Sequence, residues 1–179
     1  MTHGEATWTQ LSRSTVFQRF GRNVDEVHYR LPNGHQDAFY IKNERPAVSV
    51  LALTESQQVI LVRQYRPGPD RILAELPGGY LGHDENPEYA AERELLEETG
   101  YRPRALQYVA DCWDDAYSTM FRKCFVAIGC VKVSDPDPEI TETLEVVLTD
   151  MQDFRRQLRN GLSTDVEVGY MCLDYLELL

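Results

Sequence analysis

The sequence is poor in positive charge. Its 18 lysine and arginine residues stand against 29 aspartate and glutamate residues, so the formal net charge is −11 at pH 7. Nucleic acids and anionic membranes attract basic protein faces, and this balance therefore argues against either of them as a partner. A local cluster of acids could still serve a phosphate-bearing substrate if divalent cations lie between the two sets of negative charge.

Long apolar runs and abundant cysteine are also missing. No apolar stretch is long enough to span a bilayer. Residues 1–9 have neither a basic start nor an apolar run, so we expect no signal peptide. A chain of 179 residues buries enough surface to fold without disulfides. The four cysteines show no metal-ligand or redox spacing, which predicts reduced thiols in a cytoplasmic protein.

The first part of the chain predicts β-structure. Residues 15–42 read as two or three strands, and the Asn-Gly pair at 33–34 is a strong hairpin signal. Pro46 marks a boundary, because proline fixes φ and lacks a backbone donor. We therefore predict an N-terminal β extension over residues 1–45 and a main domain over residues 46–179.

The main domain predicts an α/β fold, in which helices cover a mixed sheet. Two buried strands are expected at 48–53 and 59–65, and the stretch 75–79 is expected to break regular structure. Further strands are expected at 106–113, 120–131 and 144–148.

Three helices are expected after residue 85. The clearest begins at Pro87, with Asn86 as its N-cap, and ends before Gly100. A second runs from about 151 to 159, capped by Thr149 or Asp150. A third starts at Thr164, whose spacing to Glu167 is that of a capping box, and ends near Leu178.

The first of these helices carries an unusual cluster of acids. Glu94, Glu97 and Glu98 are spaced i, i+3 and i+4, which places three carboxylates on one helical face. Like charges at this spacing repel, so a purely structural, acidic surface helix is the less favoured reading. Mg²⁺ takes oxygen ligands and would neutralise them. Arg93 lies beside Glu97 around the helix and could orient the carboxylates.

This segment resembles the Nudix box. The pattern is a glycine, five residues, a glutamate, seven residues, then Arg-Glu, an aliphatic residue, any residue, Glu-Glu, any residue, glycine and an aliphatic residue. The matching positions are Gly79, Glu85, Arg93, Glu94, Leu95, Glu97, Glu98 and Gly100. Only Tyr101 departs, at a packing position. The resemblance implies a Nudix-type α/β/α sandwich with a mixed sheet.

The resemblance extends beyond the box. The stretch Arg-Gln-Tyr-Arg-Pro at 63–67, followed by Glu-Leu-Pro at 75–77, is similar to the corresponding part of ADP-ribose pyrophosphatases and related nucleoside diphosphate sugar hydrolases. The N-terminal strands resemble the extension that helps to build a dimer in that subfamily. The implied protein is a homodimer acting on a small-molecule nucleotide.

The resemblance also assigns metal ligands. It implies that Glu94 and Glu98 bind Mg²⁺, for which Mn²⁺ can substitute, and that Glu97 joins them or binds a second ion. The backbone carbonyl of Gly78 is a ligand in relatives. Glu85 is expected to fix the geometry of the loop that leads into the helix.

Catalytic and substrate-binding roles follow in the same way. Glu98, Arg93 and Glu142 form the implied catalytic set, with Glu139 as a possible substitute for Glu142, whose alternative is a solvated loop acid. A glutamate would take the proton as water attacks phosphorus.

The implied substrate contacts come from four residues. Arg63 and Arg66 are candidates for gripping the pyrophosphate, because guanidinium matches phosphate oxygens in pairs. Their alternative is a salt-bridged strand end. Glu75 matches an acidic position near the substrate, and Phe39 is a candidate to contact the base, against a plain packing role.

The implied reaction is hydrolysis of the pyrophosphate bond of a nucleoside diphosphate derivative. ADP-ribose or another nucleoside diphosphate sugar would give a nucleoside monophosphate and a sugar phosphate. The segment 113–120 departs from many ADP-ribose pyrophosphatases, because it lacks their proline and the acid after the serine. Alternatives are therefore a nucleoside triphosphate or dinucleoside polyphosphate hydrolase, or a non-catalytic nucleotide-sensing domain.

Overall fold

The computed structural model describes residues 7–19, 21–138 and 143–179. The chain divides into two compact units. One extends as far as Arg45 and also contains Trp113–Phe121. The other consists of Pro46–Cys112 and Arg122–Leu179.

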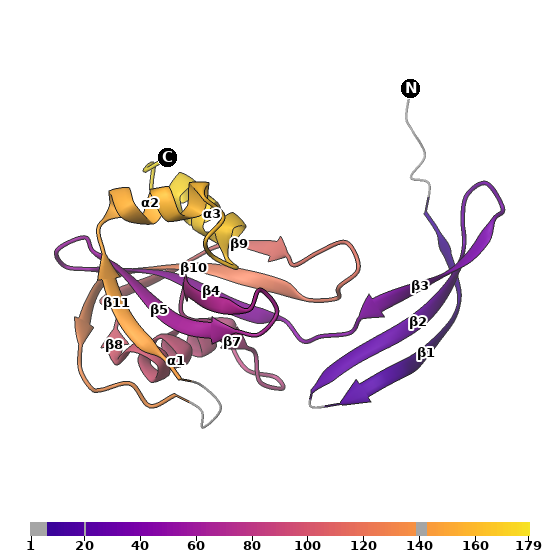
Figure 1. Cartoon of the computed structure of the whole chain (residues 1–179), viewed down its shortest axis with the longest axis horizontal. Helices are drawn as coiled ribbons and strands as arrows, with labels where there is room; N and C mark the ends of the chain where they lie inside the picture. The colour runs from indigo at the N-terminus through magenta and orange to yellow at the C-terminus, as the bar shows by residue number, and fades with distance from the viewer. Residues whose placement is uncertain (1–6, 20, 139–142) are drawn as a thin grey trace. The chain divides into compact units, whose positions relative to one another are not determined.

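The first unit is built on an antiparallel three-stranded sheet (Figure 1). The sequence predicts two or three strands within residues 15–42, and the first strand begins earlier, at Thr9. Its strands are β1 (Thr9–Arg19), β2 (Arg22–Arg30) and β3 (Gln36–Lys42), in the order β1-β2-β3. The Asn-Gly pair at 33–34 lies in the turn between β2 and β3, so the hairpin prediction is confirmed.

The segment Trp113–Phe121 is tied to the end of β3. The backbone N–H of Lys42 donates to the carbonyl of Tyr117 at 2.8 Å, and the N–H of Thr119 donates to the carbonyl of Lys42 at 2.9 Å. The Lys42 ammonium lies 2.8 Å from Asp114 Oδ2. These contacts join residues more than 70 positions apart, and the sequence contains no local signal for them.

The second unit is built on a mixed eight-stranded sheet. Its main path runs β11-β5-β4-β10-β8, with β6 paired to β5, β7 to β4 and β9 to β10. The sheet is mixed because β4 is parallel to β10 and antiparallel to β5. The strands are β4 (Ala47–Thr54), β5 (Val59–Arg66), β6 (Arg71–Glu75), β7 (Gly78–Tyr80), β8 (Tyr101–Arg102), β9 (Ala105–Trp113), β10 (Phe121–Lys132) and β11 (Glu145–Thr149).

The predicted break in regular structure at 75–79 is confirmed, but it is shorter than predicted. Glu75 still belongs to β6, and Gly78 already begins β7. Only Leu76 and Pro77 lie outside the strands, and the carbonyl of Pro77 still accepts a hydrogen bond from the backbone N–H of Val50 at 2.9 Å. Proline lacks a donor but keeps its acceptor, so the chain remains hydrogen-bonded to β4.

Helices cover both faces of this sheet, which confirms the predicted α/β/α sandwich (Figure 1). Helix α1 (Pro87–Thr99) lies on one face, and α2 (Met151–Arg159) and α3 (Val166–Tyr175) lie on the other. Side chains along a strand alternate between faces, so β4 serves two cores. Leu51 and Leu53 pack with α2 and α3, whereas Val50 and Ala52 pack with α1.

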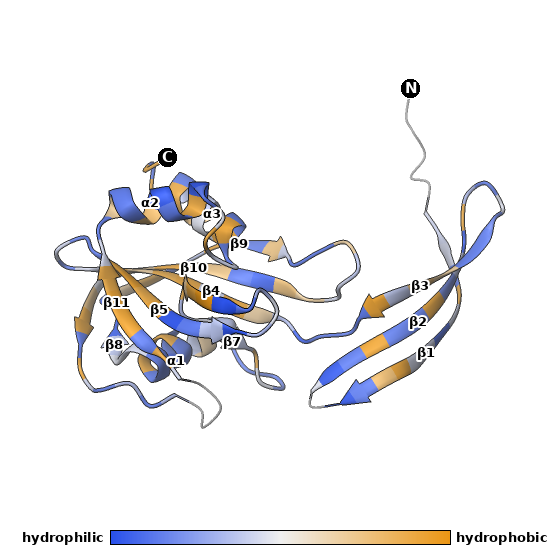
Figure 2. Ribbon diagram, viewed as in Figure 1, coloured by the Kyte–Doolittle hydropathy of each residue, from blue (hydrophilic) through white to orange (hydrophobic). Residues whose placement is uncertain are grey.

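The burial pattern explains why the central strands lack polar alternation. Every residue of β4 is buried, as expected for a strand that is covered on both faces. In Figure 2 the strands of this sheet carry much of the orange, whereas α2 is largely blue. None of the helices in the described part of the chain is both long and apolar enough to cross a membrane.

The helix ends test the capping predictions. Asn86 accepts hydrogen bonds from the backbone N–H groups of Glu88 and Tyr89, and Gly100 closes α1 with φ 76°. Asp150, one of the two predicted caps, accepts from the N–H of Asp153 at the start of α2. These predictions are confirmed.

The predicted capping box of α3 is wrong. The helix begins at Val166, with Asp165 at the N-cap position. Thr164 donates its hydroxyl to Glu75 Oε1 at 2.6 Å, and Glu167 pairs with Arg122 at 2.9 Å. Both side chains are therefore engaged by distant residues rather than by the helix end.

The burial of the Asp165 carboxyl is expected to make the free energy of unfolding depend on pH. Burial raises the pKa of this carboxyl to about 6. A folded-state pKa above the unfolded value means that the folded protein binds more protons between about pH 4 and pH 6, so stability falls as pH rises through this window. We expect a loss on the order of 2–3 kcal/mol by pH 7, which Asp165→Asn removes. Urea unfolding of the wild type and of Asp165→Asn across this pH range measures this loss. A difference in free energy of unfolding between the two proteins that stays constant with pH would contradict the prediction.

Candidate active site

The acidic face of α1 meets the strand that precedes it. Glu94, Glu97 and Glu98 share this face, because residues three and four apart lie together on a helix. Glu98 is buried, with 3% of its surface exposed. Its Oε2 accepts a hydrogen bond from the backbone N–H of Gly78 at 2.9 Å. The helix and β7 are therefore joined through this carboxylate.

Two glycines of β7 allow the close approach. A Cβ on Gly78 would lie 2.2 Å from the carbonyl oxygen of Val48, which belongs to the paired strand β4. A Cβ on Gly79 would lie 2.5 Å from Oε1 of Glu94. The first glycine of the box is thus required where the strand passes directly against an acidic side chain of α1.

The guanidinium of Arg93 holds three carboxylates. Its Nε lies 2.8 Å from Glu85 Oε1, and its Nη1 lies 2.8 Å from Glu94 Oε1 and 2.9 Å from Glu97 Oε2. The hydrogen bond to Glu85 is the main cause of the raised pKa of Arg93, and burial opposes it. Arg93 offsets the repulsion within the acidic face and fixes the side chains that share it.

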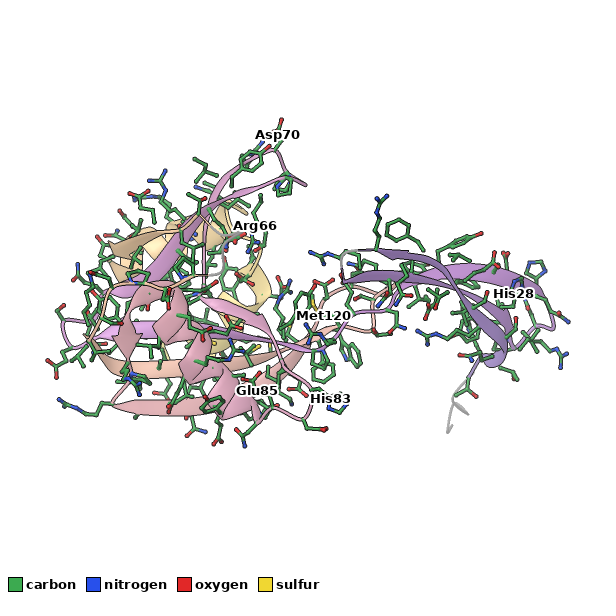
Figure 3. All side chains as sticks on the ribbon, turned by 90° about the horizontal axis from the view of Figure 1, so that it is seen from below. His28, Arg66, Asp70, His83, Glu85 and Met120 are labelled. Atoms are coloured by element: carbon green, nitrogen blue, oxygen red, sulfur yellow. The ribbon has the colours of Figure 1, made fainter. Side chains whose placement is uncertain are left out.

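Glu85, which is labelled in Figure 3, fixes the loop before α1, as predicted from its place in the box. It receives Arg93 on both oxygens, at 2.8 and 3.2 Å, and the backbone N–H of Gly82 at 2.7 Å. The hydrogen bond from Arg93, followed by that from Gly82, lowers the pKa of this carboxyl. Glu85 therefore joins the loop to the helix through a hydrogen bond from Gly82 and an ion pair with Arg93.

The donor set fits a hard divalent ion. Magnesium is commonly held by one or two carboxylates, and substrate phosphates and water supply the remaining ligands. Glu94 and Glu98 both lie against β7, beside Gly79 and Gly78. Within the described ranges, no group of three or more histidine, cysteine, aspartate or glutamate side chains is arranged to hold a metal by itself.

Arg66 and Glu75 form a partly buried ion pair. Arg66 Nε donates to Glu75 Oε2 at 2.7 Å, and Nη2 lies 2.6 Å from the same oxygen. Glu75 is 1% exposed, whereas the Arg66 side chain is 42% exposed. The guanidinium of Arg66 is therefore held by the buried Glu75, while much of the Arg66 side chain remains exposed to solvent.

Arg63 has different surroundings from Arg66. Its Nη1 donates to Glu145 Oε2 at 2.9 Å from within β5. Arg66, which ends β5 and pairs with Glu75, is the residue that matches the alternative of a salt-bridged strand end. It also lines a hollow of about 400 Å³ with Arg71 of β6 and Arg156 of α2. Its assignment to the pyrophosphate stays a prediction.

The remaining predicted residues have varied outcomes. Phe39 lies in an aromatic cluster of the first unit, where its ring is stacked with that of Tyr117 at a centroid distance of 6.4 Å and contacts Trp8 at 4.9 Å. Its role toward a base stays a prediction. Glu142 and its substitute Glu139 lie outside the described residues.

Thr164 was absent from the predicted site. It contacts Glu75 across 89 positions of the chain. Its only sequence signal, the spacing to Glu167, indicated a helix cap instead.

Comparison with known proteins shows which family and fold this sequence matches. The family profile described as NUDIX domain matches residues 43–164. An ADP-ribose pyrophosphatase of Bacillus subtilis is 35% identical over 160 residues, covering 87% of this chain and 83% of that protein. An ADP-sugar pyrophosphatase of Mus musculus is 43% identical over 114 residues, covering 60% of this chain and 47% of that protein.

A solved structure has the same fold. The crystal structure of an ADP compounds hydrolase superposes with a TM-score of 0.80 and covers 96% of this chain and 95% of its own. Its sequence identity is 20%, so the likeness concerns the fold alone.

Proposed function

The chain belongs to the Nudix family of enzymes, which hydrolyse phosphoanhydride bonds, and we propose that its substrate is ADP-ribose or another nucleoside diphosphate sugar. The products would be a nucleoside monophosphate and a sugar phosphate. The coarser activity, Nudix pyrophosphohydrolase, follows from family membership. The choice of substrate is supported by two relatives, a bacterial ADP-ribose pyrophosphatase and a mammalian ADP-sugar pyrophosphatase.

The contact between α1 and β7 is the observation that carries the proposal. Glu98 accepts from the backbone of Gly78, Glu94 lies against Gly79, and Arg93 holds the neighbouring carboxylates. A non-catalytic nucleotide-sensing domain would have no need to keep this acidic set. We therefore favour catalysis over sensing.

We assign the acids of α1 to divalent ion binding. Glu94 and Glu98, with the carbonyl of Gly78, are the proposed ligands, and Glu97 joins them or serves a second ion. The ion, magnesium or manganese in its place, would neutralise phosphate charge and lower the pKa of bound water. Nudix enzymes generally use a divalent metal.

The protein's own groups then bind substrate and move a proton. Arg66 projects from the buried Glu75 and grips the pyrophosphate, since a guanidinium matches phosphate oxygens in pairs. Glu142 is the proposed acceptor of the proton from the attacking water. Phe39 is the proposed contact for the base.

Assembly and location are further parts of the proposal. We expect a cytoplasmic homodimer that uses the N-terminal sheet. The homodimer is supported by the exposed apolar side chains of β1, among them Val16 and Phe17, which are 52% and 51% exposed. Contiguous exposed apolar side chains are typical of protein interfaces.

A substrate panel with magnesium tests the activity. We expect ADP-ribose or another nucleoside diphosphate sugar to be cleaved with the highest kcat/KM among ADP-ribose, ADP-glucose, GDP-mannose, UDP-glucose, dinucleoside polyphosphates and 8-oxo-dGTP. Products are resolved by chromatography, and excess EDTA is expected to abolish turnover. Preference for 8-oxo-dGTP or a dinucleoside polyphosphate would overturn the substrate assignment. Undiminished turnover in EDTA would overturn the role of the ion.

A further inference from the structure

The buried carboxylate of Glu75 connects two distant parts of the chain. Its Oε2 receives Arg66, with N to O distances of 2.6 and 2.7 Å. Its Oε1 receives the hydroxyl of Thr164 at 2.6 Å. Gln64 adds a longer contact of 3.5 Å to Oε2. Both oxygens of a side chain that is only 1% exposed are therefore engaged.

The two partners of Glu75 differ in how they are held. Arg66 ends β5, where its long side chain has several rotatable bonds, and it is labelled in Figure 3. Thr164 lies in the short connection between α2 and α3, which pack on the core through Phe154, Leu158 and Leu173. The hydroxyl of Thr164 therefore fixes one oxygen of Glu75 against the helical layer, and the other oxygen fixes Arg66.

Removing this hydroxyl would leave one oxygen of a buried carboxylate without its donor. A buried charged group that loses a hydrogen bond carries the full desolvation penalty of the unsatisfied atom, and reorientation toward its remaining partners would reduce this penalty. Arg66 and Gln64 both lie on the side of Oε2, so the carboxylate would rotate toward them. Any such rotation moves the guanidinium, because a charge-assisted pair has a strict geometry.

We propose that Thr164 is a positioning residue for Arg66, acting through Glu75. This rests on the proposed function, in which Arg66 grips the pyrophosphate of the substrate. It also revises the role of Glu75, which acts behind the arginine rather than on the substrate. Thr164 does not touch the substrate and is not a catalytic residue.

The chain offers matched variants for the test. Thr164→Val keeps the shape and removes the hydroxyl, Thr164→Ser keeps the hydroxyl, and Thr164→Ala is a second hydroxyl-free variant should valine prevent folding. Ser163→Ala is the control for a merely structural role. Its hydroxyl accepts a hydrogen bond from the backbone N–H of Asp165 at 3.3 Å, at the start of α3. Within the described residues, this N–H is the only partner of the Ser163 hydroxyl.

Binding of magnesium and ADP, measured by calorimetry, gives a readout that does not need turnover. We expect Thr164→Val to weaken ADP binding about tenfold and to raise KM for the best nucleoside diphosphate sugar similarly, with kcat within about threefold. Thr164→Ser and Ser163→Ala should bind ADP like the wild type. In an Arg66→Gln background, Thr164→Val should cause no further loss, because coupled residues are not additive.

The outcomes separate the two proposals. Unchanged ADP binding in both hydroxyl-free variants, an equal loss in Ser163→Ala, or full additivity with Arg66→Gln would overturn the role of Thr164. Arg66→Gln with wild-type ADP affinity would overturn it as well. Failure of the wild type to cleave any nucleoside diphosphate sugar would instead overturn the proposed function, and the ADP binding comparison would still report on Thr164.

Discussion

Glu98→Gln is expected to lower the turnover of ADP-ribose on the order of 10³-fold, the scale on which removal of one preorganised charge-stabilising group acts. The amide has nearly the same shape, and its oxygen can still accept from the backbone N–H of Gly78, so the fold should persist. What is lost is the negative charge that a divalent ion needs at this position. Initial rates with magnesium, together with circular dichroism, measure the effect.

Glu92→Gln is the matched control for this variant. Glu92 lies on the exposed side of the same helix, so the same chemical change there should leave turnover within about twofold, as expected for a surface substitution. Wild-type-like turnover in Glu98→Gln would remove Glu98 from the catalytic set. Unfolding of Glu98→Gln would show instead that the carboxylate is needed for the contact between α1 and β7.

Arg93→Lys is expected to lower turnover about 10- to 100-fold and to raise the magnesium concentration needed for half-maximal rate. The positive charge stays, but an ammonium cannot match the forked geometry by which Arg93 contacts Glu85, Glu94 and Glu97 together. The three carboxylates would then repel one another more strongly and would be held less firmly in position. Steady-state rates across a magnesium titration give both quantities.

Arg104→Lys tests whether any arginine change has this effect. Arg104 pairs with Glu55 at an exposed site, where the side chains are 76% and 57% exposed. An exposed pair contributes little, so this variant should have the wild-type magnesium dependence. An Arg93→Lys enzyme with unchanged magnesium dependence would show that the guanidinium does not orient the metal-binding acids.

The elements that could be predicted are those with local causes. The ends of helix α1 could be predicted from its capping residues, Asn86 and Gly100, because capping involves residues within one turn of the helix end. The buried strands β4 and β5 could be predicted from short apolar runs. The acidic face of α1 could be predicted because helical spacing alone places Glu94 and Glu98 together.

The elements that were missed depend on contacts between distant residues. Strands β6 and β7 exist because β5 and β4 provide partners for them. The five residues of β6 lie between two stretches of glycine and proline, at 67–69 and 77–79, and carry little local information of their own. Thr164 had the spacing of a capping residue, but the buried Glu75 competes for its hydroxyl. The pairing of Trp113–Phe121 with the N-terminal sheet depends on Lys42 and has no local signature.

The role of the acidic face of α1 can be measured most directly by anomalous X-ray scattering from crystals soaked with manganese and a non-hydrolysable ADP-ribose analogue. We expect an anomalous peak bonded to carboxylate oxygens of Glu94 and Glu98, with phosphate oxygens of the analogue completing the coordination, and no peak in Glu98→Gln crystals. Bound analogue with no manganese beside these two glutamates would contradict the assignment.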